Sequence, residues 1–164
     1  MYQHILIPLD GSAISEEALL EARRMLDKGA RITLVTAVDV PELPVGSFDM
    51  YGSLVTSDTE SQRQMEEWAK RYLAHTAESL TMEGYVVKTF SEVGEPSKII
   101  ATIAAHENAD CIVMTTHGRS GVSRWLFGSI TNKVLSIAAC PVLVVPSKEK
   151  LRMLEKSSPE AFYG

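Results

Sequence analysis

The chain has 164 residues, a length typical of one domain, and its 45% hydrophobic and 23% charged residues are ordinary for a globular protein. Its formal net charge of -5 argues against a duplex nucleic-acid binder, which normally carries a basic face. No apolar run approaches the roughly 18 residues of a membrane span, and the start lacks the features of a signal peptide. We therefore expect a cytoplasmic protein with no membrane or nucleic-acid partner.

Short apolar runs rich in β-branched residues alternate with segments of helical periodicity along most of the chain. In chain order the pattern predicts strand 3–9, helix 15–28, strand 32–38, a helix over 65–80, strand 85–90, a helix opened by Pro96, strand 111–114, a helix carrying Ile130, Val134, Ile137 and Ala138, and strand 142–145. Such alternation implies parallel strands with helical crossovers, and strands apolar on both sides imply helices on both faces. We predict an α/β, doubly wound, five-stranded parallel fold.

Residues 1–146 are assigned to one domain, and residues 147–164 to a charged C-terminal tail. Leu151 and Leu154 permit one short helix in the tail, although a frayed terminus is the simpler interpretation. A long connection over residues 41–61 contains Pro, Gly and Ser, and loops of this length occur as lids, as partner-binding arms or as mobile segments.

Four residues that invite a functional role are interpreted as structural. Cys111 and Cys140 lie in or beside apolar runs, without the spacing of a metal site or a CxxC redox pair. They are expected to be small buried hydrophobes rather than a redox switch. Trp68 and Tyr72 belong to the apolar stripe of the helix over 65–80, and we expect them in the core rather than as a stacking platform.

Two loops at the predicted carboxyl edge of the sheet are unusual, and open parallel sheets bind ligands at this edge. The first loop is Pro8-Leu9-Asp10-Gly11-Ser12. Asp10 places a carboxylate at the edge, Gly11 permits a tight turn, and Ser12 or Ser15 can cap the following helix. Two interpretations stay open: Asp10 contacts a ribose, a base or a phosphate-bound metal ion, or the loop is only a helix-capping turn.

The second loop is Thr115-Thr116-His117-Gly118-Arg119-Ser120-Gly121, which continues to Gly128-Ser129-Ile130-Thr131. Its glycines allow backbone N–H groups to approach an anion, and Gly128-Ser129 opens a helix whose first N–H groups favour negative charge. The hydroxyls of Ser129 and Thr131 can add hydrogen bonds. The alternative is a surface loop with ordinary turn glycines, and helix-start anion binding is the favoured interpretation.

Neither common nucleotide motif is present. The sequence contains no GxxxxGK[ST] and no GxGxxG after a strand, so Walker-type hydrolysis and dinucleotide binding are unsupported. His117 has no companion acid or nucleophile with an identifiable place, and a local hydrogen bond is its expected role. We therefore expect no catalytic residue and no direct metal site.

Five motifs together resemble the universal stress protein family: I-L-I-P-L-D-G-S near the start, G-E-P before a helix, V-M-T-T-H-G-R-S-G, the later G-S, and C-P-V-L-V-V. The resemblance covers residues 1–146 and implies the strand order 3-2-1-4-5. The ATP-binding branch of that family carries G-x-x-G, nine residues, and G-[S/T]. Gly118, residues 119–127 and Gly128-Ser129 match this pattern, while Thr115 replaces its first glycine.

The resemblance implies ATP, or a related adenine nucleotide, as ligand, with Mg or Mn as an optional ion held through its phosphates and Asp10. Pro8, Asp10 and Ala37 would border the adenine and ribose, and the second loop would surround the phosphates. The β-branched side chain of Thr115 would narrow the pocket, weaken binding or change the preferred nucleotide. The candidate nucleotide-binding residues are Pro8, Leu9, Asp10, Ala37, Thr115, Thr116, His117, Gly118, Arg119, Ser120, Gly121, Gly128, Ser129, Ile130 and Thr131.

The last strand is apolar and, in the order implied by the family, lies at an edge of the sheet. An uncovered apolar edge is an aggregation hazard. Antiparallel pairing with a second copy would satisfy both edges, as the family commonly does, and we expect a homodimer through Val142, Leu143, Val144 and Val145. The alternative is that the charged tail covers the edge within one chain.

Three functions are compatible with these observations. The first is a stress-response module that binds an adenine nucleotide and signals its occupancy to an unknown downstream protein. The second is a nucleotide-free dimeric scaffold in which Thr115 closes the pocket. The third is a slow nucleotide hydrolase that uses Asp10 to hold a metal ion, which the sequence disfavours because it offers no positioned base and no phosphate-binding lysine.

Overall fold

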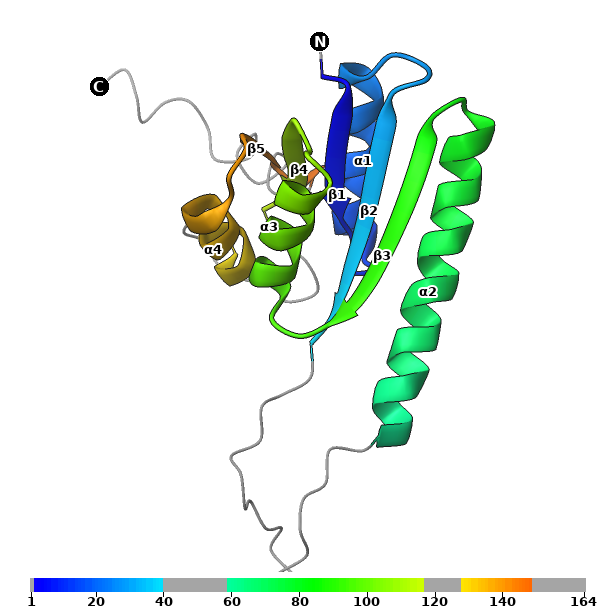
Figure 1. Cartoon of the computed structure of the whole chain (residues 1–164), viewed down its shortest axis with the longest axis vertical. Helices are drawn as coiled ribbons and strands as arrows, with labels where there is room; N and C mark the ends of the chain where they lie inside the picture. Colours follow the sequence, from blue (N-terminus) through cyan, green and yellow to red (C-terminus); the bar gives the residue numbers. More distant parts are fainter. Residues whose placement is uncertain (1, 40–58, 117–127, 149–164) are drawn as a thin grey trace, which may run out of the picture.

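The computed structural model describes residues 2–39, 59–116 and 128–148 (Figure 1). Its elements are β1 (His4–Pro8), α1 (Ala13–Met25), β2 (Arg31–Val38), α2 (Thr59–Met82), β3 (Val86–Val93), α3 (Pro96–His106), β4 (Cys111–Thr115), α4 (Ser129–Ile137) and β5 (Val142–Val145). The five strands form one parallel sheet in the order β3-β2-β1-β4-β5. The predicted fold class and strand order are confirmed.

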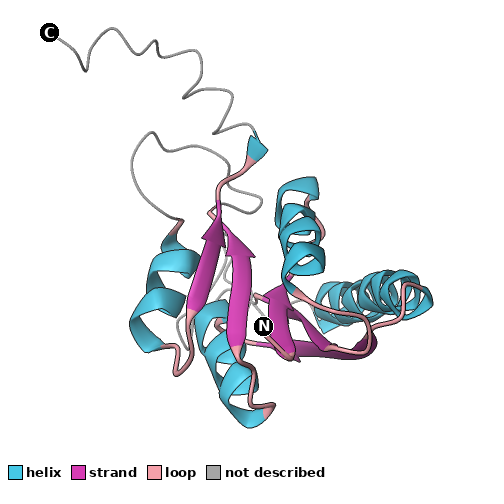
Figure 2. Cartoon of the chain, turned by 90° about the horizontal axis from the view of Figure 1, so that it is seen from above, coloured by secondary structure: helices cyan, strands magenta, loops and turns pink. Residues whose placement is uncertain are grey.

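The sheet is covered on both faces because its central strands are apolar on both sides. Ile5 and Ile7 of β1 pack toward α1 and α2, whereas Leu6 between them packs toward α3 and α4. All three side chains are fully buried. Figure 2 shows the sheet between these two helical layers. Because helices cover both faces of the sheet, a ligand site is expected at the ends of the strands.

Helix α2 begins earlier than the apolar pattern indicates. Its first turns contain Glu60, Arg63 and Glu67, and the Arg63 guanidinium forms ion pairs of 2.9 Å with both carboxylates. These turns are polar and exposed, so an apolar stripe does not reveal them. In Figure 1 this N-terminal part of α2 extends past the carboxyl ends of β2 and β3.

Edge strand β3 departs from the expected pattern. It starts after Tyr85 and continues to Val93, and all eight of its residues are exposed or half-buried. The expectation of strands buried on both sides is therefore wrong for β3, and also for β5, whose residues are half-buried or exposed, because each of these strands has a single neighbour in the sheet. Tyr85, just outside it, is buried, with the Lys28 ammonium 4.5 Å from its ring centre.

Helix α1 ends at Met25, before the predicted Lys28. Leu26 leaves the helix in an extended conformation and is buried in the core. Gly29 follows in the left-handed region at φ +86°, and its N–H donates to the carbonyl of Gly84 at 2.8 Å. The turn after α1 is therefore tied to the turn after α2.

The residues that follow β5 contact α1. Ser147 is buried, and the Lys148 N–H donates to the Glu17 carboxylate at 2.9 Å. The frayed tail predicted from residue 147 is thus wrong for these first two residues, because packing and this hydrogen bond fix them. Residues 149–164, with Leu151 and Leu154, lie outside the described structure.

Both cysteines are free thiols. Cys111 is buried and Cys140 half-buried, and burial raises the pKa of each thiol. A raised pKa keeps a thiol protonated and unreactive at neutral pH, as expected for a packing residue.

None of the described helices is both long and apolar enough to span a membrane.

Candidate functional site

The candidate residues gather at the carboxyl edge of the sheet because all five strands are parallel. The Leu9 N–H donates to the Val35 carbonyl, and the Thr36 hydroxyl donates to the Leu9 carbonyl, at 2.8 and 2.9 Å. These bonds hold the loop after β1 beside the end of β2. On its other side, β1 pairs with β4, whose last residue is Thr115.

The loop after β1 is a self-contained capping turn. Ser12 is the N-cap of α1, where its hydroxyl accepts from the Ser15 N–H at 3.1 Å. The Asp10 carboxylate in turn accepts from the Ser12 N–H at 3.0 Å and from the Ser12 hydroxyl at 2.6 Å, both through Oδ1. The capping role considered for this loop is therefore shown. It also fixes the Asp10 carboxylate at the sheet edge.

The neighbouring candidates differ in accessibility. Pro8 and Ala37, at the ends of β1 and β2, are half-buried. Leu9 is buried in the core, and both of its backbone polar groups are already hydrogen-bonded. Leu9 therefore supports the loop from within, whereas Pro8 and Ala37 present accessible surface at the edge.

The start of α4 is joined directly to the end of β4. The Gly128 N–H donates to the Thr116 carbonyl at 2.8 Å, and the buried Thr131 hydroxyl donates to the Thr115 carbonyl at 3.2 Å. The Thr131 hydroxyl, predicted to be a ligand contact, is thus engaged with the protein. The first turn of α4 is held against the strand end.

This helix start differs from those of α1 and α3, which both have a side-chain cap. Among the described residues, the N-cap position of α4 is Gly128, and no side-chain cap hydrogen bond is formed from it. The first N–H groups of an α-helix have no partner within the helix. Ser129 and Ile130, which carry two of them, are exposed. The turn therefore offers N–H donors and the positive end of the helix dipole to an anion.

A buried hydroxyl lies beside this uncapped turn. Thr116 is 2% exposed, and its Oγ1 has no hydrogen-bond partner within the described structure. A buried polar atom without a partner costs about 1–3 kcal/mol, so such atoms often mark a place for a ligand or water. The chemistry of this corner, with N–H donors and a hydroxyl, suits a phosphate.

Thr115 stands where the family pattern has its first glycine. Its side chain lies on the face of the sheet opposite to α4. Cys111 and Val113 of β4 pack toward α1, whereas Ile112 and Met114 pack toward α3 and α4. Alternation along a strand then directs the buried Thr115 side chain toward the α1 face.

The central residues of the second loop, His117, Gly118, Arg119, Ser120 and Gly121, lie outside the described residues. The remaining loop candidates, Thr115, Thr116 and 128–131, are brought together by the contacts given above. No group of three His, Cys, Asp or Glu residues suited to a metal ion occurs within residues 2–39, 59–116 and 128–148.

Trp68 is a site neighbour that the sequence interpretation missed. It was expected in the core, but 37% of it is exposed, and its ring lies against Gly11 in the loop after β1. The expectation holds for Tyr72, which packs partly buried against the core. Trp68 is exposed because the N-terminal part of α2 extends past the strand ends. No local pattern could reveal this pairing, since the two residues are far apart in the sequence.

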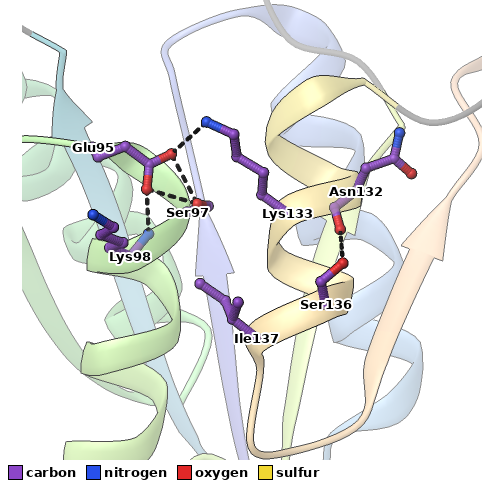
Figure 3. A pocket seen from close by; sticks show the side chains of 7 residues that line it. All are labelled: Glu95, Ser97, Lys98, Asn132, Lys133, Ser136 and Ile137. Atoms are coloured by element: carbon purple, nitrogen blue, oxygen red, sulfur yellow. Dashed lines mark hydrogen bonds and ion pairs between the residues drawn. The ribbon is translucent and has the colours of Figure 1, made fainter.

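A separate groove of about 420 Å³ lies between α3 and α4 (Figure 3). Its most prominent charges are paired, since the Lys133 ammonium lies 3.2 Å from the Glu95 carboxylate. Glu95 also accepts from the Ser97 hydroxyl and the Lys98 N–H, and these contacts lower its pKa to about 2, with the Ser97 bond the largest cause. The Glu95 carboxylate caps the start of α3 and pairs with Lys133. Because these groups already bind one another, this groove is not the candidate site.

Comparison with known proteins identifies the family. The model of the universal stress protein family matches residues 1–146. Universal stress protein MJ0531 of Methanocaldococcus jannaschii is 31% identical over 156 residues, covering 92% of this chain and 85% of the relative. The solved structure of MJ0577 from the same organism has a TM-score of 0.77 at 31% identity, covering 90% of this chain and 98% of that one.

A more distant solved structure shares the fold. It is a universal stress protein family member from Arabidopsis thaliana, At3g01520, described with AMP bound. Its TM-score is 0.59 at 13% identity, and the match covers 89% of this chain and 92% of that one. With the family model and the closer relatives, this fold likeness agrees with the sequence motifs. The chain belongs to the universal stress protein family.

Proposed function

We propose that this protein binds ATP or a closely related adenine nucleotide and that its occupancy is a regulatory signal in the stress response. The observation that carries the proposal is the start of α4 beside the buried Thr116 hydroxyl: within the described residues the first has no side-chain cap and the second no hydrogen-bond partner. The nucleotide described in the Arabidopsis relative supports the same ligand class. The cytoplasmic location expected from the sequence is part of this proposal.

In this account the phosphates lie at the first turn of α4. The N–H groups of Ser129, Ile130 and Thr131 and the Thr116 hydroxyl would donate to phosphate oxygens. The ribose would lie toward Asp10, whose carboxylate can accept from a sugar hydroxyl, and the base toward Pro8 and Ala37. A Mg²⁺ or Mn²⁺ ion would be held mainly by the phosphates, since hard cations prefer oxygen ligands.

We propose binding without efficient turnover. A hydrolase needs a group that positions or deprotonates water, and Asp10 Oδ1 already holds the α1 cap. Purified protein incubated with ATP and Mg²⁺ should release phosphate no faster than an Asp10→Ala control. Turnover that disappears in Asp10→Ala, while nucleotide binding persists, would establish the hydrolase instead.

Two measurements test the ligand. Purified protein should release an adenine nucleotide on denaturation, identified by mass spectrometry, or should bind ATP by titration calorimetry with one nucleotide per chain. Adenosine should bind more weakly, because it lacks the phosphates that α4 would receive. Protein that is empty and that binds neither ATP nor AMP would leave the dimeric scaffold as the function.

We also propose that two copies pair through β5. This strand lies at the edge of the sheet and exposes 37% of Leu143. The tail does not start along this edge, because the Lys148 N–H is bonded to Glu17 of α1. Antiparallel pairing across a two-fold axis would satisfy the open backbone groups of both copies.

Light scattering after size exclusion tests this pairing. The wild-type chain should have twice its monomer mass, and Val144→Lys should be a folded monomer, because the new charge faces desolvation in the interface. Lys133→Ala, which removes an exposed side chain of α4, should remain dimeric. A Val144→Lys dimer of unchanged mass would place the interface elsewhere.

A further inference from the structure

Two aromatic side chains of α2 contact the loop after β1. The rings of Trp68 and Tyr72 are stacked, with centres 5.3 Å apart and planes 1° from parallel. The Tyr72 hydroxyl donates to the carboxylate of Glu16, in the first turn of α1, at 2.9 Å. Burial raises the pKa of Tyr72, so the hydroxyl stays protonated and remains a donor at neutral pH. We call Trp68 and Tyr72 the aromatic clamp.

The contact between Trp68 and the loop requires a glycine. Gly11 has a φ of +78°, and a Cβ at this position would lie 2.4 Å from Cη2 and 2.6 Å from Cζ2 of Trp68. Distances this short are far inside van der Waals contact. A shift of the ring away from this Cβ would disturb its stacking on Tyr72, whose hydroxyl is bonded to Glu16. Gly29 has a similar φ of +86°, but nothing lies within 4 Å of its position for a Cβ.

Displacement of Gly11 would also move the Asp10 carboxylate. Gly11 lies between Asp10 and Ser12, and both the N–H and the hydroxyl of Ser12 donate to Asp10 Oδ1. These three residues therefore form one rigid turn. Trp68 covers this turn from the side of α2, while Tyr72 fixes the helix that follows it.

We infer that the aromatic clamp is a positioning element of the ligand site: Trp68 and Tyr72 hold the Asp10 turn in the geometry that accepts the nucleotide. This inference rests on the proposed function and extends it to α2, which the family pattern quoted above does not include. It assigns Gly11 a second role besides its backbone conformation, which is to admit the Trp68 ring.

A double-mutant cycle tests the contact without any ligand. Gly29→Ala should lower Tm by about 2–8 °C, the cost of a left-handed alanine alone. Gly11→Ala should lower Tm by clearly more, because the Cβ also meets Trp68. In a Trp68→Ala background, Gly11→Ala should cost no more than Gly29→Ala. Equal costs of Gly11→Ala in both backgrounds would show that Trp68 does not hold the turn, and would overturn the inference.

Nucleotide titration then tests the consequence. At a temperature where every variant is folded by circular dichroism, Trp68→Ala should weaken ATP binding about tenfold, and Trp68→Phe by less than about threefold. Tyr72→Phe should fall between them. Met82→Ala, an exposed change at the far end of α2, should bind as wild type does.

The outcomes separate the two proposals. If wild type binds ATP and Trp68→Ala binds it within about twofold of wild type, the clamp is only a packing contact and this inference is wrong, while the proposed function stands. If wild type binds no nucleotide, the proposed function is wrong, and the clamp has no ligand to position.

Discussion

Helices α1 and α4 both begin at the carboxyl edge of the sheet, and their first turns are built in opposite ways. The start of α1 is closed by its own residues, since Ser12 caps the helix and Asp10 holds Ser12. The start of α4 has no side-chain cap among the described residues, and the hydroxyl of Thr116 beside it is buried without a partner. The same edge of the sheet thus carries one helix start that is closed by its own residues and one that, among the described residues, has its N–H groups available to an external anion.

The largest expected difference is in the free energy of unfolding, between variants of two buried threonines. Thr33→Val should lower the free energy of unfolding by about 1–3 kcal/mol, because it leaves the buried His4 Nε2 without its 2.8 Å partner. Thr116→Val removes a hydroxyl that has no partner among the described residues, so it should raise the same free energy by up to about 1 kcal/mol. Urea denaturation of nucleotide-free protein measures both.

Thr116→Val should at the same time weaken ATP binding about fivefold, close to 1 kcal/mol, through the lost donor. Thr33→Val should leave the affinity unchanged, since it lies inside the sheet. Destabilisation of Thr116→Val to the same extent as Thr33→Val would mean that the Thr116 hydroxyl is satisfied, and the contrast between the two helix starts would disappear.

A second pair compares serines at the two helix starts. Ser12→Ala should lower the free energy of unfolding by about 0.5–2 kcal/mol, the usual cost of losing an N-cap. Ser129→Ala should change it by less than about 0.5 kcal/mol, because Ser129 is exposed and follows the N-cap position. Urea denaturation again provides the measurement. Equal losses in the two variants would show that α4 is capped after all.

The smallest expected effect is the change of stability with pH that is caused by His4, a histidine remote from both helix starts. Burial, the largest cause, lowers the pKa of His4 from 6.5. Below about pH 6.5 the His4 imidazole binds a proton more readily in the unfolded chain than in the folded chain. The free energy of unfolding should therefore fall as the pH drops below about 6.5. The carboxylates with lowered pKa values, such as Glu95, contribute stability that is lost only below about pH 4.5, their unfolded value.

Urea midpoints at about pH 7.5 and about pH 5, compared between wild type and His4→Gln, isolate the contribution of this histidine. The midpoint should be lower at the acidic value, and His4→Gln should reduce the difference. A wild-type midpoint that rises on acidification would contradict the assignment of His4 as a buried neutral side chain.

The sequence supports much of the fold, for physical reasons. Apolar runs such as Ile5–Ile7 mark strands buried on both faces, and Pro96 marks a helix start that the structure places at the same residue. The beginning of α2 was missed because ion pairs at Arg63, and not apolar burial, hold it.

The candidate site was only partly predictable. Glycine spacing drew attention to Gly128, and the carboxylate and serines drew attention to Asp10. The contact of Trp68 with Gly11 depends on how α2 crosses the strand ends, which is a tertiary property without a local signal. The role of the Thr131 hydroxyl likewise depends on the nearby end of β4.

The central claim is that the first turn of α4 receives phosphate, and amide chemical shifts measure this directly. Addition of ATP to isotope-labelled protein should shift the N–H resonances of Ser129, Ile130 and Thr131 strongly, while adenosine should leave them nearly unchanged. The capped start of α3, at Ser97 and Lys98, should respond to neither. Shifts limited to the Asp10 turn, or equal shifts with adenosine, would contradict the claim.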